Sequence, residues 1–192
     1  MRLIVGLGNR GDQYSETRHN VGFMLLERLA ERHGVEWRIQ RLFGLTGEWE
    51  SKDTVRLLQP HTMMNRSGEA LRYIEDWDLK PSDILIVCDD VNIPLGMLRL
   101  RASGGPGGHH GLESCLAQLG TEDVSRLRVG VGREPLPKDL TEFVLSSFDR
   151  EERPQLDEAL ARAVEACEVW IDEGIHAAMN RTNQKPQHEG NA

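Results

Sequence analysis

Residues 83–88 read Asp-Ile-Leu-Ile-Val-Cys, and no polar residue interrupts this stretch after the first aspartate. A strand with one face in water alternates polar and apolar residues, so an unbroken apolar run predicts a strand covered on both faces. Such strands are typical of parallel sheets that have helices packed against each side. The run therefore predicts an α/β fold.

The rest of the chain alternates short apolar runs with segments of helical periodicity. We predict further strands at residues 3–7, 55–58, 97–101 and 127–131, and helices at 20–33, 67–77, 112–119 and 151–171. This alternation favours one sheet with helices on both faces. We predict a single domain at residues 1–183, a three-layer α/β/α sandwich around a twisted, mixed and mostly parallel sheet. A polar tail at residues 184–192 should follow it.

Composition limits the cellular setting and the partners. The formal net charge is −8, so the molecule as a whole does not attract nucleic acid, although a local basic patch can. The three cysteines lie far apart without a C-x-x-C pair, which favours a reducing compartment. The first apolar run is too short for a signal peptide, and no run approaches ~20 apolar residues. We expect a soluble, cytoplasmic protein.

The first strand is followed by glycines with the G-x-G-x-x-G spacing of dinucleotide-binding proteins: Gly6, Gly8 and Gly11. That site needs a helix starting at the third glycine, but no helical apolar stripe begins before Val21. It also needs an acidic residue at the end of a second strand about 20 residues on, where this chain has a helix end. We interpret the glycines as a sharp turn that places Asn9 at the sheet's edge.

Polar side chains gather after the predicted strands and in the loops: Asn9, Tyr14, Arg18, His19, Asn20, Met64 with Asn65, Asp89 with Asp90, and His109 with His110. Residues at the carboxyl ends of parallel strands converge on one crevice, so these groups can meet. Each also has a simpler explanation as a turn, cap or solvated loop residue. A metal site of His19, Asp89 and His109 stays open, although no helical ligand spacing such as H-E-x-x-H supports it.

Several motifs in order resemble the bacterial peptidyl-tRNA hydrolase family. They are VGLGN at 5–9, TRHN at 17–20, TMMN at 62–65, CDDVNIPLGMLRLR at 88–101, GGHHGL at 107–112, LRVGVGR at 127–133 and FVLSSF at 143–148, with a weaker echo in MNRTN at 179–183. The resemblance implies hydrolysis of the ester that joins a peptide to the 3′ ribose of tRNA. It also implies a monomer that uses no metal and no cofactor.

The resemblance assigns roles to individual residues. The catalytic histidine is His19, its partner is Asp89, and Asn9 and Asn65 position the substrate beside Met64. Tyr14 and His110 match positions near the substrate, and Arg99, Arg101 and Arg133 match basic positions associated with tRNA. The chemistry agrees, because an imidazole can take a proton from water, a carboxylate can orient it, and uncharged amides can hold an oxyanion. No serine or cysteine accompanies His19 in a motif, which favours direct attack by water.

Two positions depart from the family pattern. The glycine loop usually reads G-H-N-G, and here His110 replaces the asparagine. A histidine titrates near neutral pH, so we predict reduced or more pH-sensitive activity. Gln59 stands where the family usually has lysine, which removes one positive charge. Both changes favour a weaker tRNA site.

The charged residues are segregated along the chain. Arg99 and Arg101 share one face of a strand, and Arg128, Arg133 and Lys138 should extend this basic face, whereas acidic residues crowd residues 149–173. Residues 104–111 are glycine-rich enough to act as a gate over the site. Two rivals remain: a non-catalytic RNA-binding protein of the same fold, such as a splicing factor, and a small-molecule hydrolase that shares the sheet.

Overall fold

The computed structural model describes residues 1–41 and 43–184, apart from the side chains of residues 75 and 76. Its centre is a seven-stranded sheet with the order β2-β3-β4-β1-β5-β7-β6. The strands are β1 (Arg2–Gly6), β2 (Arg38–Gln40), β3 (Gly44–Glu50), β4 (Thr54–Pro60), β5 (Ile84–Pro94), β6 (Leu98–Arg101) and β7 (Ser125–Gly132). Of the tail predicted at residues 184–192, all but Gln184 lies outside the described residues.

The sheet is mixed, as predicted. Its four central strands β4, β1, β5 and β7 pair in parallel. Strands β3 and β6 run against their neighbours near the two edges. Strand β5 lies between β1 and β7, and its first residues, including the apolar run, are buried. The prediction of a central strand covered on both faces is confirmed, although β5 continues beyond Asp89 and Asp90 instead of ending before them.

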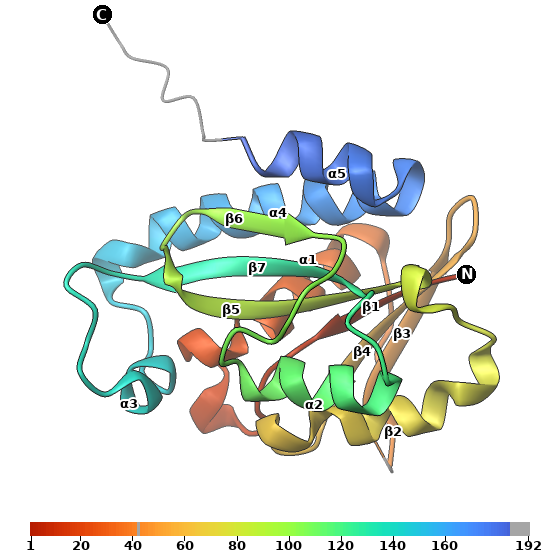
Figure 1. The fold of residues 1–192 in the computed structure, drawn as a ribbon, viewed down its shortest axis with the longest axis horizontal. Coiled ribbons are helices and arrows are strands. Elements are labelled where there is room, and N and C mark those ends of the chain that lie inside the picture. The colour runs from red at the N-terminus through yellow and green to blue at the C-terminus, as the bar shows by residue number, and fades with distance from the viewer. Residues whose placement is uncertain (42, 185–192) are drawn as a thin grey trace, which may run out of the picture.

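Helices cover both faces of this sheet (Figure 1). The α-helices are α1 (Val21–His33), α2 (His110–Leu119), α3 (Leu140–Val144), α4 (Arg153–Glu173) and α5 (Ile175–Thr182), and the 3₁₀ helices are η1 (Asp12–Tyr14), η2 (Arg18–Asn20), η3 (Met64–Trp77), η4 (Pro81–Asp83) and η5 (Arg150–Glu152). Helices α1 and α4 pack with one face of the sheet, and α2 and η3 pack with the other. The three-layer α/β/α architecture is therefore confirmed. None of the described helices is long and apolar enough to cross a membrane.

Two predicted helix starts are wrong. The helix expected from Ser67 begins at Met64 as η3, and the Ser67 hydroxyl donates to the Met64 carbonyl instead of capping. Helix α2 begins at His110 rather than Leu112, because the ring of His109 accepts a hydrogen bond from the Leu112 N–H and caps the helix. The cap at the start of α2 thus fixes the position of the His109 ring.

The glycine motif serves the packing of β1 against α1. A Cβ on Gly6 would lie 2.5 Å from the Gly22 carbonyl oxygen, and a Cβ on Gly8 would lie 2.7 Å from the Phe23 ring. Helix α1 begins at Val21, well after Gly11. The glycines therefore let the helix approach the end of β1 closely, and the dinucleotide interpretation stays rejected.

The end of the chain closes the outer edge of the sheet. The Asn183 side chain accepts a hydrogen bond from the Leu100 N–H at 2.8 Å and donates one to the Leu100 carbonyl at 3.0 Å. It thereby pairs with the β6 backbone as a neighbouring strand would. The C-terminal MNRTN motif thus has a structural role, because its Asn183 binds the backbone of Leu100, the residue between the two exposed arginines of β6.

Candidate active site

A pocket of about 540 Å³ opens where the carboxyl ends of β1, β4 and β5 meet. Six residues that the sequence marked as site residues line it: Asn9, His19, Met64, Asn65, Asp89 and His110. Asn9 follows β1, Met64 follows β4, and Asp89 lies within β5. Since the helices after β1 and β4 cover opposite faces of the sheet, this is the place where an open α/β sheet binds its ligand.

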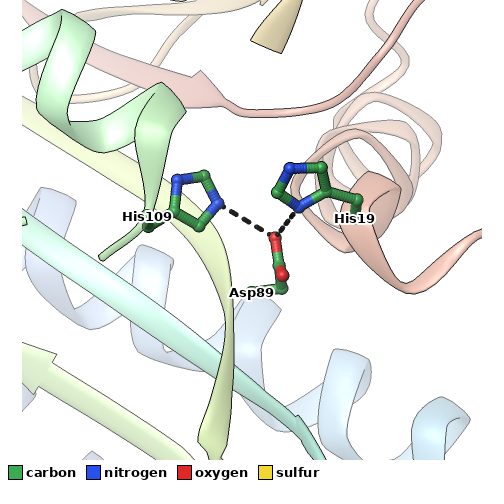
Figure 2. Close-up of side chains that lie close together, drawn as sticks. All are labelled: His19, Asp89 and His109. Atoms are coloured by element: carbon green, nitrogen blue, oxygen red, sulfur yellow. Dashed lines mark hydrogen bonds and ion pairs between the residues drawn. The ribbon is translucent and has the colours of Figure 1, made fainter. Parts of the chain in front are cut away.

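One carboxylate oxygen holds two histidines at the centre of the pocket (Figure 2). Asp89 Oδ1 lies 2.7 Å from His19 Nδ1 and 3.0 Å from His109 Nε2. The two rings are tilted, with their centroids 5.0 Å apart. Asp89 and His109 are buried, whereas the side chain of His19 keeps 15% of its surface exposed. His19 is therefore the member of this group that a ligand can reach.

The hydrogen bonds determine where the ring protons lie. His109 Nδ1 accepts from the Leu112 N–H at 3.1 Å, so its Nε2 carries the proton and donates to Asp89. His19 Nδ1 likewise donates to Asp89, which leaves His19 Nε2 unprotonated in the neutral ring. The ligand atoms of His19, Asp89 and His109 lie within 4.8 Å of one another, as a metal site would need. However, a metal-binding histidine donates its other N–H, and the other nitrogen of His109 accepts instead. The site suits protons better than a metal ion.

The charge of Asp89 depends on the same contacts. Burial alone would raise the pKa of the Asp89 carboxyl, but the contacts of His109 and His19 with this carboxylate outweigh burial and hold the pKa below its usual range. Asp89 is thus an anion at neutral pH. An anion on the Nδ1 side of His19 favours protonation of the ring when Nε2 receives a proton.

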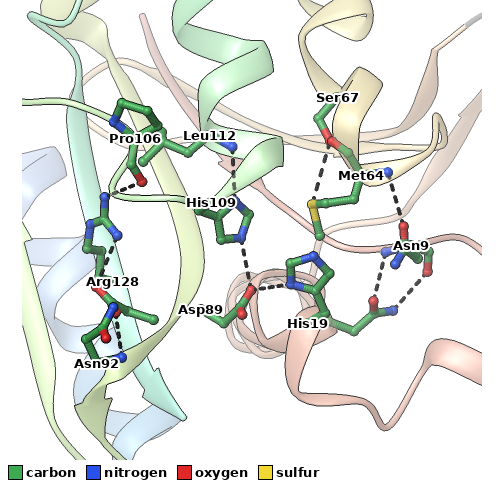
Figure 3. A network of polar contacts seen from close by, with 12 residues as sticks. Asn9, His19, Met64, Ser67, Asp89, Asn92, Pro106, His109, Leu112 and Arg128 are labelled. Atoms are coloured by element: carbon green, nitrogen blue, oxygen red, sulfur yellow. Dashed lines mark hydrogen bonds and ion pairs between the residues drawn. The ribbon is translucent and has the colours of Figure 1, made fainter. Parts of the chain in front are cut away.

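Two asparagines fix the turn after β1 (Figure 3). The Asn20 side chain binds the Asn9 backbone on both sides, with Asn9 N–H donating at 2.8 Å and Asn20 Nδ2 donating to the Asn9 carbonyl at 2.9 Å. Asn9 Oδ1 in turn accepts from the Met64 N–H at 3.1 Å. No described residue accepts a hydrogen bond from Asn9 Nδ2, so this N–H group is free for a ligand.

Comparison with known proteins decides the family. The peptidyl-tRNA hydrolase family model matches residues 3–190. The chain belongs to the peptidyl-tRNA hydrolase family. The peptidyl-tRNA hydrolase of Desulfitobacterium hafniense is 46% identical over 186 residues, covering 96% of this chain and 100% of the relative. That of Bacillus subtilis is 40% identical over 187 residues, with 96% and 100% covered. The crystal structure of the Acinetobacter baumannii peptidyl-tRNA hydrolase is 33% identical, with a TM-score of 0.89 over 95% of this chain and 94% of that chain.

The other residues marked by the resemblance to peptidyl-tRNA hydrolases lie outside the pocket lining. Tyr14 lies half-buried in η1, before the loop that leads to His19. Arg99 and Arg101 are exposed on edge strand β6, which confirms that they share one face. Arg133 is half exposed at the end of β7 and lies 3.7 Å from Asp149. The structure thus places the three arginines at the surface and leaves all four residues outside the pocket lining.

Arg128 does not belong to the basic face. Its side chain is buried, forms a 3.0 Å ion pair with Asp90, and donates at 2.8 Å to the Pro106 carbonyl. The neighbouring strand residue Arg126 is also buried and donates to the Gly104 carbonyl. These two buried arginines therefore hold the glycine loop through the carbonyls of Gly104 and Pro106, on the N-terminal side of His109. The gate hypothesis gains no support from these contacts.

The two departures from the family pattern have different settings. Gln59 is buried in β4 and donates to Glu27 at 2.7 Å. It lies outside the pocket lining, so the replacement of the usual lysine removes no positive charge from the pocket itself. His110 is exposed at the start of α2, where its Nδ1 lies 3.4 Å from Glu113. His110 is thus an exposed imidazole at the rim of the pocket.

Proposed function

We propose that this protein hydrolyses the ester between an N-blocked peptide and the 3′ end of tRNA, using a water molecule activated by His19. Membership of the peptidyl-tRNA hydrolase family supports the reaction. One observation carries the mechanism: Asp89 holds His19 through Nδ1 at 2.7 Å and leaves Nε2 as a base in the pocket.

The reaction needs one proton to move twice. His19 Nε2 takes a proton from water as the water oxygen attacks the ester carbonyl carbon, and Asp89 stabilises the imidazolium. When the tetrahedral intermediate collapses, the bond to the ribose oxygen breaks and the imidazolium returns the proton to that oxygen. The products are a peptide with a free carboxylate and a tRNA with a free 3′ end. The general base contributes about 10²–10⁴ in rate.

The oxyanion of the intermediate needs donors beside His19. Asn9 Nδ2 has no partner among the described residues, and Asn65 lines the pocket at the first turn of η3. Uncharged amides suit this role, since losing one such donor costs about 10²–10³ in rate. The Asn20 clamp on the Asn9 backbone fixes the first donor before substrate arrives.

Direct attack by water fits the remaining side chains. Cys88 precedes Asp89, but burial raises the pKa of its thiol to about 12, so it does not supply a thiolate. Thr141 lines the pocket, yet no hydrogen bond among the described residues joins it to His19. We therefore propose no acyl-enzyme.

The tRNA is proposed to lie across the exposed arginines of β6 and toward the pocket. Arg99 and Arg101 supply positive charge, with Arg133, Tyr14 and His110 nearer the acceptor end. With about three to five phosphate contacts, binding should be modest and strongly salt-dependent, as suits an enzyme that releases tRNA. We further propose that the protein acts as a cytoplasmic monomer.

One experiment tests the function against its rivals. Purified protein is incubated with N-acetyl-aminoacyl-tRNA and with the same tRNA carrying the free aminoacyl group. We expect rapid cleavage of the N-blocked ester and slow cleavage of the other. An RNA-binding protein of this fold would retain the tRNA without cleaving it, and that result would overturn the proposal.

A further inference from the structure

Arg18, the residue before His19, is buried to an unusual degree for a charged side chain. Its side chain is 1% exposed, and its guanidinium carbon lies over two aromatic rings, 4.4 Å from the Phe143 centroid and 4.8 Å from that of Phe148. Its edge donates to Glu152 at 2.6 Å. A planar cation can stack on both faces and bind a carboxylate at its edge, which lysine cannot do.

The backbone joins the same two segments. The Arg18 N–H donates to the Ser146 carbonyl at 3.0 Å, and Thr17 forms a β-bridge with Ser147. The loop that carries His19 is thus attached to residues 143–148. Figure 1 shows α3 at the margin of the fold, on the chain between β7 and α4. Arg18 and its backbone are therefore a main attachment of this segment to the catalytic loop.

Helix α3 and the residue after it form an apolar wall of the pocket. The wall consists of Leu140, Thr141, Val144 and Leu145. Leu140 is 42% exposed and Leu145 is 40% exposed, so apolar surface faces an open pocket that also contains His19. An apolar side chain of a ligand would gain by covering such a surface.

We propose that Arg18 is a positioning residue that fixes this apolar wall at a set distance from His19 and thereby determines how well the side chain of the esterified residue fits. The inference rests on the proposed function, because it needs an ester carbonyl placed at His19. Since the wall and His19 line one pocket, the side chain next to that carbonyl is the part of the peptide that we assign to the wall. Phe143 transmits the effect, since it stacks on Arg18 and belongs to α3 itself.

The test compares two substrates that differ in that side chain. One tRNA is acylated with N-acetylglycine or with N-acetylphenylalanine, and KM and kcat are measured for wild type, Arg18→Lys, Phe143→Leu and Glu152→Gln. We expect KM for the phenylalanyl ester to rise about tenfold, as for a lost apolar contact, and KM for the glycyl ester to change less than about twofold. The pH profile of kcat for the glycyl ester should be unchanged. If Arg18→Lys does not fold, the other two variants carry the test.

A matched control is available close by. Glu16 forms a 2.6 Å ion pair with Arg153, which joins the same part of the chain to α4 but is exposed, and Arg153 has no cation–π contact with either phenylalanine among the described residues. Glu16→Gln should leave both KM values unchanged. Equal changes of KM for the two esters, or none, would overturn the inference. A wild type that cleaves neither ester would instead refute the proposed function.

Discussion

Replacing Asp89 with asparagine separates the charge of this side chain from its hydrogen-bonding geometry. Both histidines bind the same oxygen, Oδ1, at 2.7 Å and 3.0 Å. An asparagine that places its carbonyl oxygen there can still accept from His19 Nδ1 and His109 Nε2. The ring orientation and the proton positions are then retained, and the variant loses the negative charge beside the imidazolium.

The size of the effect follows from that loss. Two opposite charges about 4 Å apart attract by about 4 kcal/mol at an effective dielectric constant of about 20. Since about 1.4 kcal/mol corresponds to a factor of ten in rate, Asp89→Asn should lower kcat by about 10³-fold. KM should change little, because Asp89 is buried beneath His19 and does not reach the tRNA.

The assay is single-turnover hydrolysis of N-acetyl-aminoacyl-tRNA with enzyme in excess over substrate. Glu168→Gln is the matched control, since Glu168 also binds a histidine, His33, at 3.1 Å, but lies outside the pocket lining. Its rate should equal that of wild type. If Asp89→Asn lost less than about tenfold in rate, the reasoning that an imidazolium forms at His19 beside Asp89 would be refuted.

Four further outcomes are expected. His109→Gln should lower the free energy of unfolding in urea by about 1 kcal/mol, because the cap of α2 is lost, and it should also lower kcat. An unchanged kcat would show that His109 does not help to orient Asp89. His110→Asn should flatten the change of kcat/KM between pH 5.5 and 8, and superimposable profiles would contradict this. Changing Arg99 and Arg101 together to glutamate should raise KM about tenfold or more at low salt with kcat nearly constant, and an unaltered KM would remove β6 from the tRNA site. The pKa of Asp89 is lower in the folded protein than in the unfolded chain. Its contribution to stability is therefore complete above the unfolded pKa of about 4 and is lost as the pH falls through the lower pKa of the folded protein. Thermal melts at decreasing pH should accordingly show less acid destabilisation for Asp89→Asn than for wild type.

The parts of the fold that sequence predicted are those specified locally. Helix α1 ends at His33 because Gly34 adopts a left-handed conformation there, as the pattern indicated. Strand β5 was predictable from its apolar run. Strands β2 and β3, on one side of the sheet, and helices α3 and α5 were not predicted, since short or half-exposed elements gain their stability from neighbours that the local pattern does not name.

The site was predictable where a motif names the residue and less so where a distant contact sets its role. His19 and Asp89 are 70 positions apart; the convergence of strand ends grouped them, and the family motifs assigned their roles. The sequence grouped His109 with His19 and Asp89 as a metal-site option, but its hydrogen bond to Asp89 was not predicted, because its capping of α2 depends on where that helix starts. Arg128 was assigned to the surface because strand alternation cannot reveal a buried partner such as Asp90.

The most direct test of the account is the single-turnover rate of His19→Ala on N-acetyl-aminoacyl-tRNA, measured beside its affinity for the same substrate. In the proposed mechanism His19 supplies the base, and the proposed tRNA contacts lie on other residues. We predict a rate about 10²–10⁴ below that of wild type with an affinity that is unchanged. Cleavage by His19→Ala at close to the wild-type rate would contradict the central claim that His19 activates the attacking water.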